Sequence, residues 1–280
     1  MKVVIAKDAG YCFGVRDAVD MAYDIANKEG EVYMLGDIVH NEKVINDLND
    51  AGAKVVNSLD DIPQNSTVLF RAHGTKNDIW EDAKKHPITI KDATCPLVHQ
   101  IHKDVKNLYN EERQIIVIGD HGHDEVIAIA DQAPDTIVVS SVEEAMKIKK
   151  YKKAGIVSQS TQAIENVQDI IKILMTKIFD LRFVNTICYP TKRNQEQIKE
   201  LALLVDVMII IGSFTSANSK RLTMLSVGIN NNTYQVTDSS ELKKEWFDNC
   251  NSVGISAGAS TPDYLINNIK NKIEQIGTTL

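Results

Sequence analysis

The sequence contains no long apolar segment, and this absence sets the first limits on the class of protein. None of its apolar runs reaches the roughly 20 residues that a helix needs to span a bilayer. Lys7 and Asp8 interrupt the first apolar stretch almost at once, so the N-terminus lacks the pattern of a secretory signal. We therefore expect a cytoplasmic protein with no membrane partner.

Cysteine is scarce, and positive charge is outweighed by negative charge. The 280 residues include four cysteines, and the formal net charge is -7. In the cytoplasm, widely spaced cysteines are more typical of thiols, metal ligands or buried residues than of disulfides. The acidic balance argues against a nucleic-acid partner, and local groups would have to hold any anionic ligand against the overall field.

The sequence does contain a regular alternation of two kinds of segment. Amphipathic stretches such as Phe13–Asn27 and Leu97–Glu111 place apolar residues on one helical face. Between such stretches lie short apolar runs, several of them β-branched, which are typical of strands buried on both faces. The alternation predicts an α/β protein with mainly parallel sheets. The predicted strands are Val3–Ala6, Val32–Leu35, Thr67–Phe70, Ile88–Ile90, Ile115–Ile118, Thr136–Val139, Gly155–Val157, Val207–Ile211 and Ser252–Ile255.

The spacing of three cysteines suggests how the chain is divided. Cys12, Cys95 and Cys188 recur at similar intervals, which favours three α/β units of similar size with one cysteine each. We expect these domains at residues 13–95, 96–186 and 187–280, with the N-terminal segment 1–12 joining the third.

Several predicted strands run directly into small, polar or histidine residues. Thr67–Phe70 leads to His73, and Ile115–Ile118 leads to His123 and Glu125. In open parallel sheets, ligands bind beyond the carboxyl ends of the strands. The pattern therefore predicts a polar cavity lined by these strand ends.

The contexts of the four cysteines differ. Glycines flank Cys12, and prolines follow Cys95 and Cys188, whereas Cys250 has neither context and is interpreted as structural. Zinc sites usually draw two ligands from a close Cys-x-x-Cys pair, which this chain lacks. Three isolated cysteines suit a four-iron cluster whose fourth iron has no protein ligand. Two alternatives stay open on this evidence: buried small side chains, and a zinc-stabilised domain.

The residues around these positions carry a family resemblance. Over essentially the whole chain, the sequence resembles the LytB (IspH) family of 4-hydroxy-3-methylbut-2-enyl diphosphate reductases. The motifs that carry the resemblance are Gly10-Tyr11-Cys12-Phe13-Gly14-Val15, Val39-His40-Asn41, Arg71-Ala72-His73-Gly74, Asp92-Ala93-Thr94-Cys95-Pro96-Leu97-Val98, Gly122-His123-Asp124-Glu125-Val126, Ser216-Ala217-Asn218-Ser219 and Ala257-Gly258-Ala259-Ser260-Thr261-Pro262.

The resemblance implies an activity and a cofactor. It implies three similar small α/β domains in a trefoil around one [4Fe-4S] cluster with an open fourth iron. The reaction would be the reductive removal of an allylic hydroxyl, which forms isopentenyl and dimethylallyl diphosphate in the last step of the methylerythritol phosphate pathway. A ferredoxin or a flavodoxin would supply the electrons.

The resemblance also implies roles for particular residues. Cys12, Cys95 and Cys188 would bind the cluster, and Glu125 would supply protons. The substrate, chiefly its diphosphate, would be bound by His40, His73, His123, Ser160, Ser216, Ala217, Asn218 and Ser260.

The sequence departs from the family pattern at three places. Ser160 replaces a threonine, Ala217 replaces a serine, and Pro190 shifts the order of the polar residues after Cys188. Two other functions remain possible from the sequence. One is another three-domain cluster enzyme such as quinolinate synthase, and the other is a non-enzymatic iron–sulfur sensor.

Overall fold

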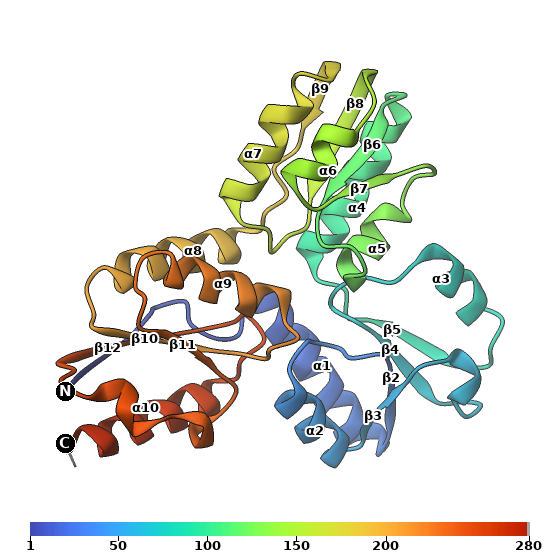
Figure 1. Cartoon of the computed structure of the whole chain (residues 1–280). Coiled ribbons are helices and arrows are strands. Elements are labelled where there is room, and N and C mark those ends of the chain that lie inside the picture. The colour runs from blue at the N-terminus through green and yellow to red at the C-terminus, as the bar shows by residue number, and fades with distance from the viewer. Residues whose placement is uncertain (279–280) are drawn as a thin grey trace. The chain divides into compact units, whose positions relative to one another are not determined.

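A computed structural model describes residues 1–278 of the chain (Figure 1). Its described residues form two compact units: one contains residues 1–16, 40–46 and 189–278, and the other contains residues 17–39 and 47–188. Within the described residues, the strands form three four-stranded sheets, and every paired strand runs parallel to its neighbour. The predicted α/β fold with three similar parallel domains is confirmed.

Helices follow the strands in regular alternation along the chain. The strands are β1 (Lys2–Ile5), β2 (Val32–Leu35), β3 (Ala53–Val56), β4 (Thr67–Phe70), β5 (Thr89–Asp92), β6 (Gln114–Ile118), β7 (Ile137–Val139), β8 (Tyr151–Ser158), β9 (Ile178–Phe183), β10 (Val207–Ile211), β11 (Thr233–Val236) and β12 (Ser252–Ala257). The helices are α1 (Phe13–Glu29), α2 (Glu42–Asp50), α3 (Asn77–Ala83), α4 (Pro96–Asn110), α5 (Asp124–Ala130), α6 (Val142–Lys147), α7 (Ile164–Leu174), α8 (Tyr189–Ala202), α9 (Ala217–Val227) and α10 (Asp263–Thr278). Short 3-10 helices are η1 (Leu59–Asp61), η2 (Ser239–Glu241) and η3 (Lys244–Phe247). None of the helices within residues 1–278 combines the length and the apolar character needed to cross a bilayer.

The larger unit contains two of the sheets, and the first has the strand order β3-β2-β4-β5. Helix α3 packs on it through Trp80, whose ring meets Phe70 edge-on at 4.6 Å between centroids. Phe70 is completely buried, so this contact joins the end of the central strand β4 to its covering helix.

The second sheet of the larger unit, β7-β6-β8-β9, is covered on both faces. Ile116 and Ile118 of β6 pack against α6 and α7, whereas Ile115 and Val117 pack against α4 and α5. Successive side chains of a strand point to opposite faces, so a strand covered on both sides must be apolar throughout. This explains the unbroken apolar run that predicted β6.

The smaller unit contains the third sheet, with the strand order β1-β12-β10-β11. Helix α10 covers one face, and α8 and α9 cover the other (Figure 1). Ile209 and Ile211 of β10 pack toward α10, and Met208 and Ile210 pack toward α8 and α9.

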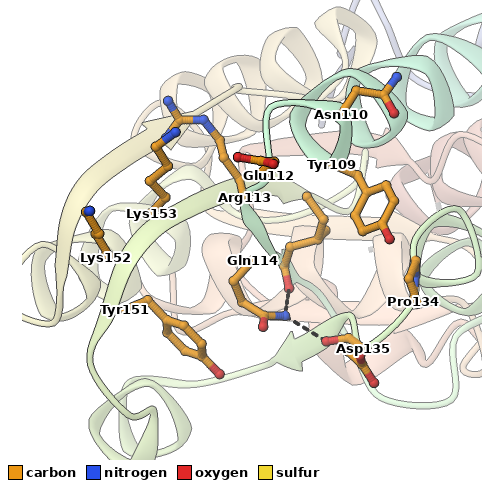
Figure 2. Close-up of a pocket in the computed structure, with 11 residues that line it drawn as sticks. Tyr109, Asn110, Glu112, Arg113, Gln114, Pro134, Asp135, Tyr151, Lys152 and Lys153 are labelled. Carbon is orange, nitrogen blue, oxygen red and sulfur yellow. Dashed lines mark hydrogen bonds between the residues drawn. The ribbon is translucent and has the colours of Figure 1, made fainter.

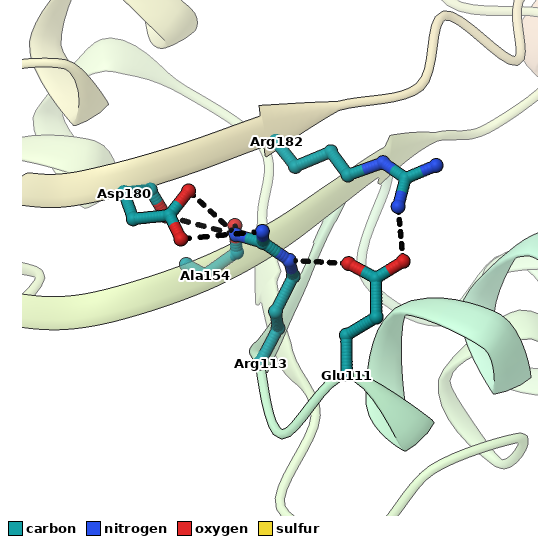
Figure 3. Close-up of polar contacts among 5 residues, drawn as sticks. All are labelled: Glu111, Arg113, Ala154, Asp180 and Arg182. Atoms are coloured by element: carbon teal, nitrogen blue, oxygen red, sulfur yellow. Dashed lines mark hydrogen bonds and ion pairs between the residues drawn. The ribbon is translucent and has the colours of Figure 1, made fainter.

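Arg113 joins the end of α4 to the edge strand β9 (Figure 3). Its guanidinium donates to the Asp180 carboxylate, with Nη1 2.9 Å from Oδ1 and Nη2 3.3 Å from Oδ2. Its Nε donates to Glu111 at 2.8 Å, and Glu111 also binds Arg182. The Arg113 side chain is 12% exposed and that of Asp180 is 42% exposed, so the bidentate pair is shielded on the arginine side only, and it holds β9 at the edge of its sheet.

The main differences from the predicted elements lie at sheet edges. The predicted helices are confirmed as α1 and α4, and the predicted strands Thr67–Phe70 and Val207–Ile211 have the observed bounds. Strands β3, β9 and β11 were not predicted, and each lies at the end of its sheet. An edge strand is less enclosed and carries more polar residues, so its apolar signal is weaker.

Gly155 gives a test of how tightly the second sheet packs. A Cβ at this position would lie 2.8 Å from the Cβ of Leu108 on α4. We expect Gly155→Ala to destabilise the protein by about 1–3 kcal/mol, because a close-packed contact has no room for another methyl group. Urea unfolding of the purified protein measures this difference.

Gly228 provides the matched control for this substitution. It ends α9 with φ −63°, and an added Cβ would meet no atom closer than 3.5 Å. Gly228→Ala should therefore be neutral or slightly stabilising. Equal unfolding midpoints for the two variants would contradict the packing described for Gly155.

Candidate active site

The residues predicted to be functional lie at the carboxyl ends of strands in all three sheets. In the larger unit, His73 follows β4, His123 and Glu125 follow β6, and Ser160 follows β8. Because β6 and β8 are parallel strands of one sheet, their carboxyl ends share one edge of it, whereas β4 belongs to the other sheet of this unit. The smaller unit repeats the pattern, with Ser216 after β10 and Ser260 after β12.

Three of the four cysteines stand immediately before a helix. Cys12 precedes the first residue of α1, Cys95 precedes that of α4, and Cys188 precedes that of α8. All three are partly exposed. The backbone N–H groups at a helix start favour negative charge, so each position suits a thiolate.

Cys250 has a different environment. It packs against the core between β12 and α10, and its thiol donates to the carbonyl of Ser252 at 3.2 Å. Burial raises the pKa of the Cys250 thiol, which favours the protonated form. This environment is that of a structural cysteine.

Glu125 and Ser160 form a buried pair. Glu125 is 2% exposed, and its Oε1 accepts the backbone N–H of Ser160 at 2.6 Å. Its Oε2 accepts the Ser160 hydroxyl at 2.9 Å, so both carboxylate oxygens are bound by one residue. The Ser160 carbonyl in turn accepts the N–H of Cys188 at 2.9 Å. The three predicted site residues are therefore linked through main-chain and side-chain hydrogen bonds.

His123 and His73 face one another near this pair. The Nδ1 of His123 accepts the backbone N–H of Glu125 at 3.2 Å, which makes His123 the N-cap of α5. Because Nδ1 accepts this hydrogen bond, a neutral His123 ring carries its proton on Nε2, and Nε2 can then serve as a donor. The His73 ring lies edge-on to it, with 5.7 Å between centroids.

Cys95 is held close to His73 along the backbone. Its N–H donates to the carbonyl of Ala72 at 3.0 Å, so the start of α4 is fixed to the segment after β4. Next to it, Thr94 donates its N–H to Asp92 at 2.9 Å.

Arg71 has a role that the sequence alone did not identify. It lies in the motif that contains His73, and its Nη1 is 2.6 Å from Oδ2 of Asp124, the residue before Glu125. Both side chains are about one quarter exposed, at 23% and 25%. A partly shielded ion pair at this place fixes the first turn of α5 and hence the direction of Glu125.

In the smaller unit, Ser260 and the segment that contains His40 are bound together. The Ser260 hydroxyl donates to the His40 carbonyl at 3.0 Å, and Asn41 Nδ2 donates to the Ser260 carbonyl at 2.8 Å. The N–H of Cys12 donates to the carbonyl of Ala259 at 3.3 Å. Three predicted site residues of this unit thus meet around the loop after β12.

The start of α9 lies against the same loop. Ser216 is the N-cap, and its hydroxyl accepts the N–H of Ser219 at 3.3 Å. Ser219 is completely buried, and a Cβ added at Gly258 would lie 2.3 Å from its Oγ. This close approach brings Asn218 beside the loop that carries Ser260, so the strand ends of β10 and β12 form one polar surface.

The altered segment after Cys188 also supports this surface. Asn194 of α8 is buried, its Nδ2 donates to the Ala257 carbonyl at 3.0 Å, and its Oδ1 accepts the Ser256 hydroxyl at 3.1 Å. Asn194 lies in the segment in which Pro190 shifts the order of the polar residues, and it fixes the end of β12.

The remaining histidines with described contacts lie outside these groups. His121 Nε2 is 2.8 Å from Glu144, and His99 Nε2 is 3.0 Å from Asp92. His102 packs against Gly74, and its buried Nε2 has no hydrogen-bond partner within residues 1–278. Burial is the main cause that lowers the pKa of His102 from 6.5 to about 4, and the charge of Lys106 contributes to the same shift.

His102 should make the folded protein sensitive to acid. Its pKa is near 6.5 when unfolded and about 4 when folded, so the unfolded chain takes up the proton more readily. Its contribution is present above pH 6.5 and is lost as the pH falls toward 4. Between pH 6.5 and pH 4, the free energy of unfolding of the wild type should therefore fall by up to about 3 kcal/mol more than that of His102→Gln.

Urea unfolding at several pH values between 7 and 4 measures this effect. His121→Gln is the control, because its ring is exposed and bound to an exposed carboxylate. If the free energy of unfolding depends on pH in the same way for the wild type and for His102→Gln, then His102 does not contribute to the acid sensitivity.

The comparisons with known proteins agree with this architecture. Parallel α/β sheets with thiol, carboxyl and imidazole groups at their strand ends define an α/β enzyme. The chain belongs to the LytB family, since the sequence model described as LytB protein matches residues 3–274. The LytB family is a family of iron–sulfur enzymes.

Relatives of known name cover almost the whole chain. A 4-hydroxy-3-methylbut-2-enyl diphosphate reductase of Geobacter sulfurreducens is 40% identical over 276 residues, which are 98% of each chain. The enzyme of that name from a Thermoanaerobacter species is 37% identical over 278 residues, with 98% of this chain and 96% of the relative covered.

Solved structures show the same similarity. The E-1-hydroxy-2-methyl-but-2-enyl-4-diphosphate reductase of Plasmodium falciparum matches with a TM-score of 0.92 and 29% identity, over 96% of this chain and 87% of that one. An (E)-4-hydroxy-3-methyl-but-2-enyl diphosphate reductase, described as the terminal enzyme of the non-mevalonate pathway, matches with a TM-score of 0.72 and 37% identity, over 98% and 100%.

Proposed function

We propose that this chain reduces 4-hydroxy-3-methylbut-2-enyl diphosphate at one [4Fe-4S] cluster bound by Cys12, Cys95 and Cys188. The reaction follows from family membership: the chain is a LytB reductase, an oxidoreductase that completes the non-mevalonate route to isopentenyl and dimethylallyl diphosphate. The observation that carries the assignment of the cluster is the position of these three cysteines, each directly before a helix.

The donor set suits such a cluster. Thiolates are its normal ligands, and three of them leave a fourth iron open. When bound, the cluster would supply electrons and a Lewis-acidic iron. With the domain boundaries predicted at 13–95, 96–186 and 187–280, and with segment 1–12 joining the third domain, each of the three cysteines would lie within two residues of a boundary. A trefoil of the three domains around the cluster belongs to the same proposal.

Glu125 is the proposed proton donor. Hydroxide leaves an allylic carbon poorly, and a proton delivered to the oxygen lets it leave as water. Reduction consumes two electrons and two protons, of which one proton leaves in water and the other is added to carbon. Glu125 is buried and is oriented by two hydrogen bonds from Ser160, which supports its assignment as a group held in place for proton transfer.

The family resemblance assigns the diphosphate to a set of polar side chains. His40, Ser216, Asn218 and Ser260 would serve from the smaller unit, and His73, His123 and Ser160 from the larger. The N–H of Ala217, in the first turn of α9, can donate where the replaced serine hydroxyl would have done so. The hydroxyls of Ser260 and Ser160 already donate to the His40 carbonyl and to Glu125. Because the oxygens of an ionised diphosphate only accept hydrogen bonds, each hydroxyl would have to exchange its present partner for a phosphate oxygen.

The remaining parts of the proposal concern the electron donor and the compartment. The electrons would come from a ferredoxin or a flavodoxin. The reaction would take place in the cytoplasm.

The cluster assignment can be tested on the cysteines one at a time. Cys12→Ser, Cys95→Ser and Cys188→Ser should each lose most of the iron, the sulfide and the visible absorption of the anaerobically purified protein. A serine hydroxyl is a poor replacement for a thiolate ligand. Iron and sulfide analysis, with circular dichroism to check folding, measures the outcome.

Cys250→Ser is the control for these variants. Its serine can still donate to the Ser252 carbonyl, so iron content should match the wild type. Full iron and sulfide in Cys95→Ser, or their loss in Cys250→Ser, would refute the assignment.

Glu125→Gln tests proton delivery. The amide is similar in size and can still accept the Ser160 N–H, but it has no acidic proton. We expect kcat to fall by roughly 10²–10⁴-fold with iron content and KM nearly unchanged, the range typical of a lost general acid. Steady-state kinetics with a reduced viologen dye measures this change.

Glu143→Gln is the control, because Glu143 is an exposed carboxylate in the first turn of α6. It should have the wild-type rate. A wild-type rate in Glu125→Gln would remove Glu125 from the mechanism, and a loss of iron in that variant would assign it a structural role.

A further inference from the structure

The amino ends of β8 and β9 carry a dense cluster of lysines. Residues 147–153 contain no acidic side chain. The five lysines of this segment are exposed, and none of them has a carboxylate within ion-pair distance among residues 1–278. They are Lys147, Lys149, Lys150, Lys152 and Lys153. This local charge is exceptional in a chain with a net charge of -7, and the overall composition conceals it.

Large apolar side chains are exposed in the adjoining segments. Phe179 at the start of β9 is 91% exposed, Met175 at the end of α7 is 65% exposed, and Met146 in the last turn of α6 is 57% exposed. Isolated exposed apolar residues are common, but a group of them marks an interaction surface.

Lys177 holds these segments together. Its Nζ donates to the Met146 carbonyl at 2.6 Å and to the Ile148 carbonyl at 2.8 Å. Its own carbonyl accepts the N–H of Tyr151 at 3.0 Å. The ends of α6 and α7 and the starts of β8 and β9 therefore form one surface, which we call the basic tip (residues 146–153 and 175–179).

Phe179 and Lys152 project from the face of the sheet opposite to α6 and α7, because their neighbours Ile178 and Tyr151 pack toward those helices. Tyr151 pairs with Ile178 and Lys153 pairs with Asp180, and this register places Lys152 beside Phe179. Lys152 and Lys153 also line a hollow of about 660 Å³, together with Tyr109 and Tyr151 (Figure 2).

We propose that the basic tip docks the protein on the surface of an anionic lipid bilayer. Lysine ammonium groups can meet the lipid phosphates while Phe179, Met175 and Met146 enter the boundary between headgroups and acyl chains. A side chain that is 91% exposed has little support from its neighbours, which suits insertion into a fluid apolar layer. The expectation of no membrane partner rested on the absence of a spanning segment, and docking on a bilayer surface needs none.

Other anionic partners fit the basic tip less well. Single-stranded nucleic acids bind through aromatic faces on which successive bases stack, and two of the three exposed apolar side chains are methionines. An electron donor would have to approach the other end of the sheet. Strand β8 has eight residues, so the tip lies about 26 Å along the strand from the Ser160 end.

Vesicle binding by the full-length protein tests the proposal. We expect co-sedimentation with vesicles of phosphatidylglycerol and phosphatidylcholine at low salt, weaker binding as salt increases, and none to phosphatidylcholine alone. The double variant Lys149→Glu with Lys150→Glu should bind at least about twentyfold more weakly, since each lysine near such a surface contributes roughly fivefold. Phe179→Ser should weaken binding without changing its salt dependence.

A matched double variant controls for net charge. Lys84→Glu with Lys85→Glu changes the charge equally, but these lysines are already paired with Glu81 and Asp82. This control should bind vesicles like the wild type, and reductase activity on soluble substrate should be unchanged in all these variants.

Three results would overturn the proposal. The first is no binding to anionic vesicles at low salt. The second is equal weakening by the two double variants, which would show that only net charge matters. The third is tighter binding to a single-stranded oligonucleotide that depends on Lys149 and Lys150 but not on Phe179, which would assign the basic tip to nucleic acid.

Discussion

Parallel strand pairing is the constraint on which the site depends. Each strand must return to the starting edge of its sheet through a crossover, so all loops that leave the carboxyl ends lie at one edge. The eight-residue strand β8 shows the consequence, because its carboxyl end leads to Ser160 while its amino end carries the basic tip. The proposed reaction site and the proposed membrane contact can therefore occupy opposite ends of one sheet without interfering.

The same constraint explains why so much of the fold could be predicted from the sequence. Strands that are covered on both faces must be apolar throughout, and β4 and β10 were predicted with their observed bounds. The strands that escaped prediction lie at sheet edges. Strand β9, with the sequence Ile-Phe-Asp-Leu-Arg-Phe, has one open side, and its Asp180 and Arg182 bind Arg113 and Glu111 instead of adding to a core.

The family resemblance proposes residues for the site but not the contacts among them. It implies roles for Glu125, Ser160 and Ser260, which stay predictions. No local signal shows that Ser160 binds both oxygens of Glu125, or that the Ser260 hydroxyl donates to the carbonyl of His40. These contacts join residues 35 and 220 positions apart, and only folding brings them together. The positive charge of the basic tip was overlooked because the net charge averages over the whole chain.

We propose that the groups at these strand ends perform the reductive loss of an allylic hydroxyl from a diphosphate ester. An anaerobic reaction of the cluster-reconstituted chain with 4-hydroxy-3-methylbut-2-enyl diphosphate and reduced methyl viologen tests this directly. We expect two electrons to be consumed for each molecule of isopentenyl or dimethylallyl diphosphate formed, and no turnover of the alcohol that lacks the diphosphate. Viologen oxidation without either product, or equal turnover of the free alcohol, would contradict it.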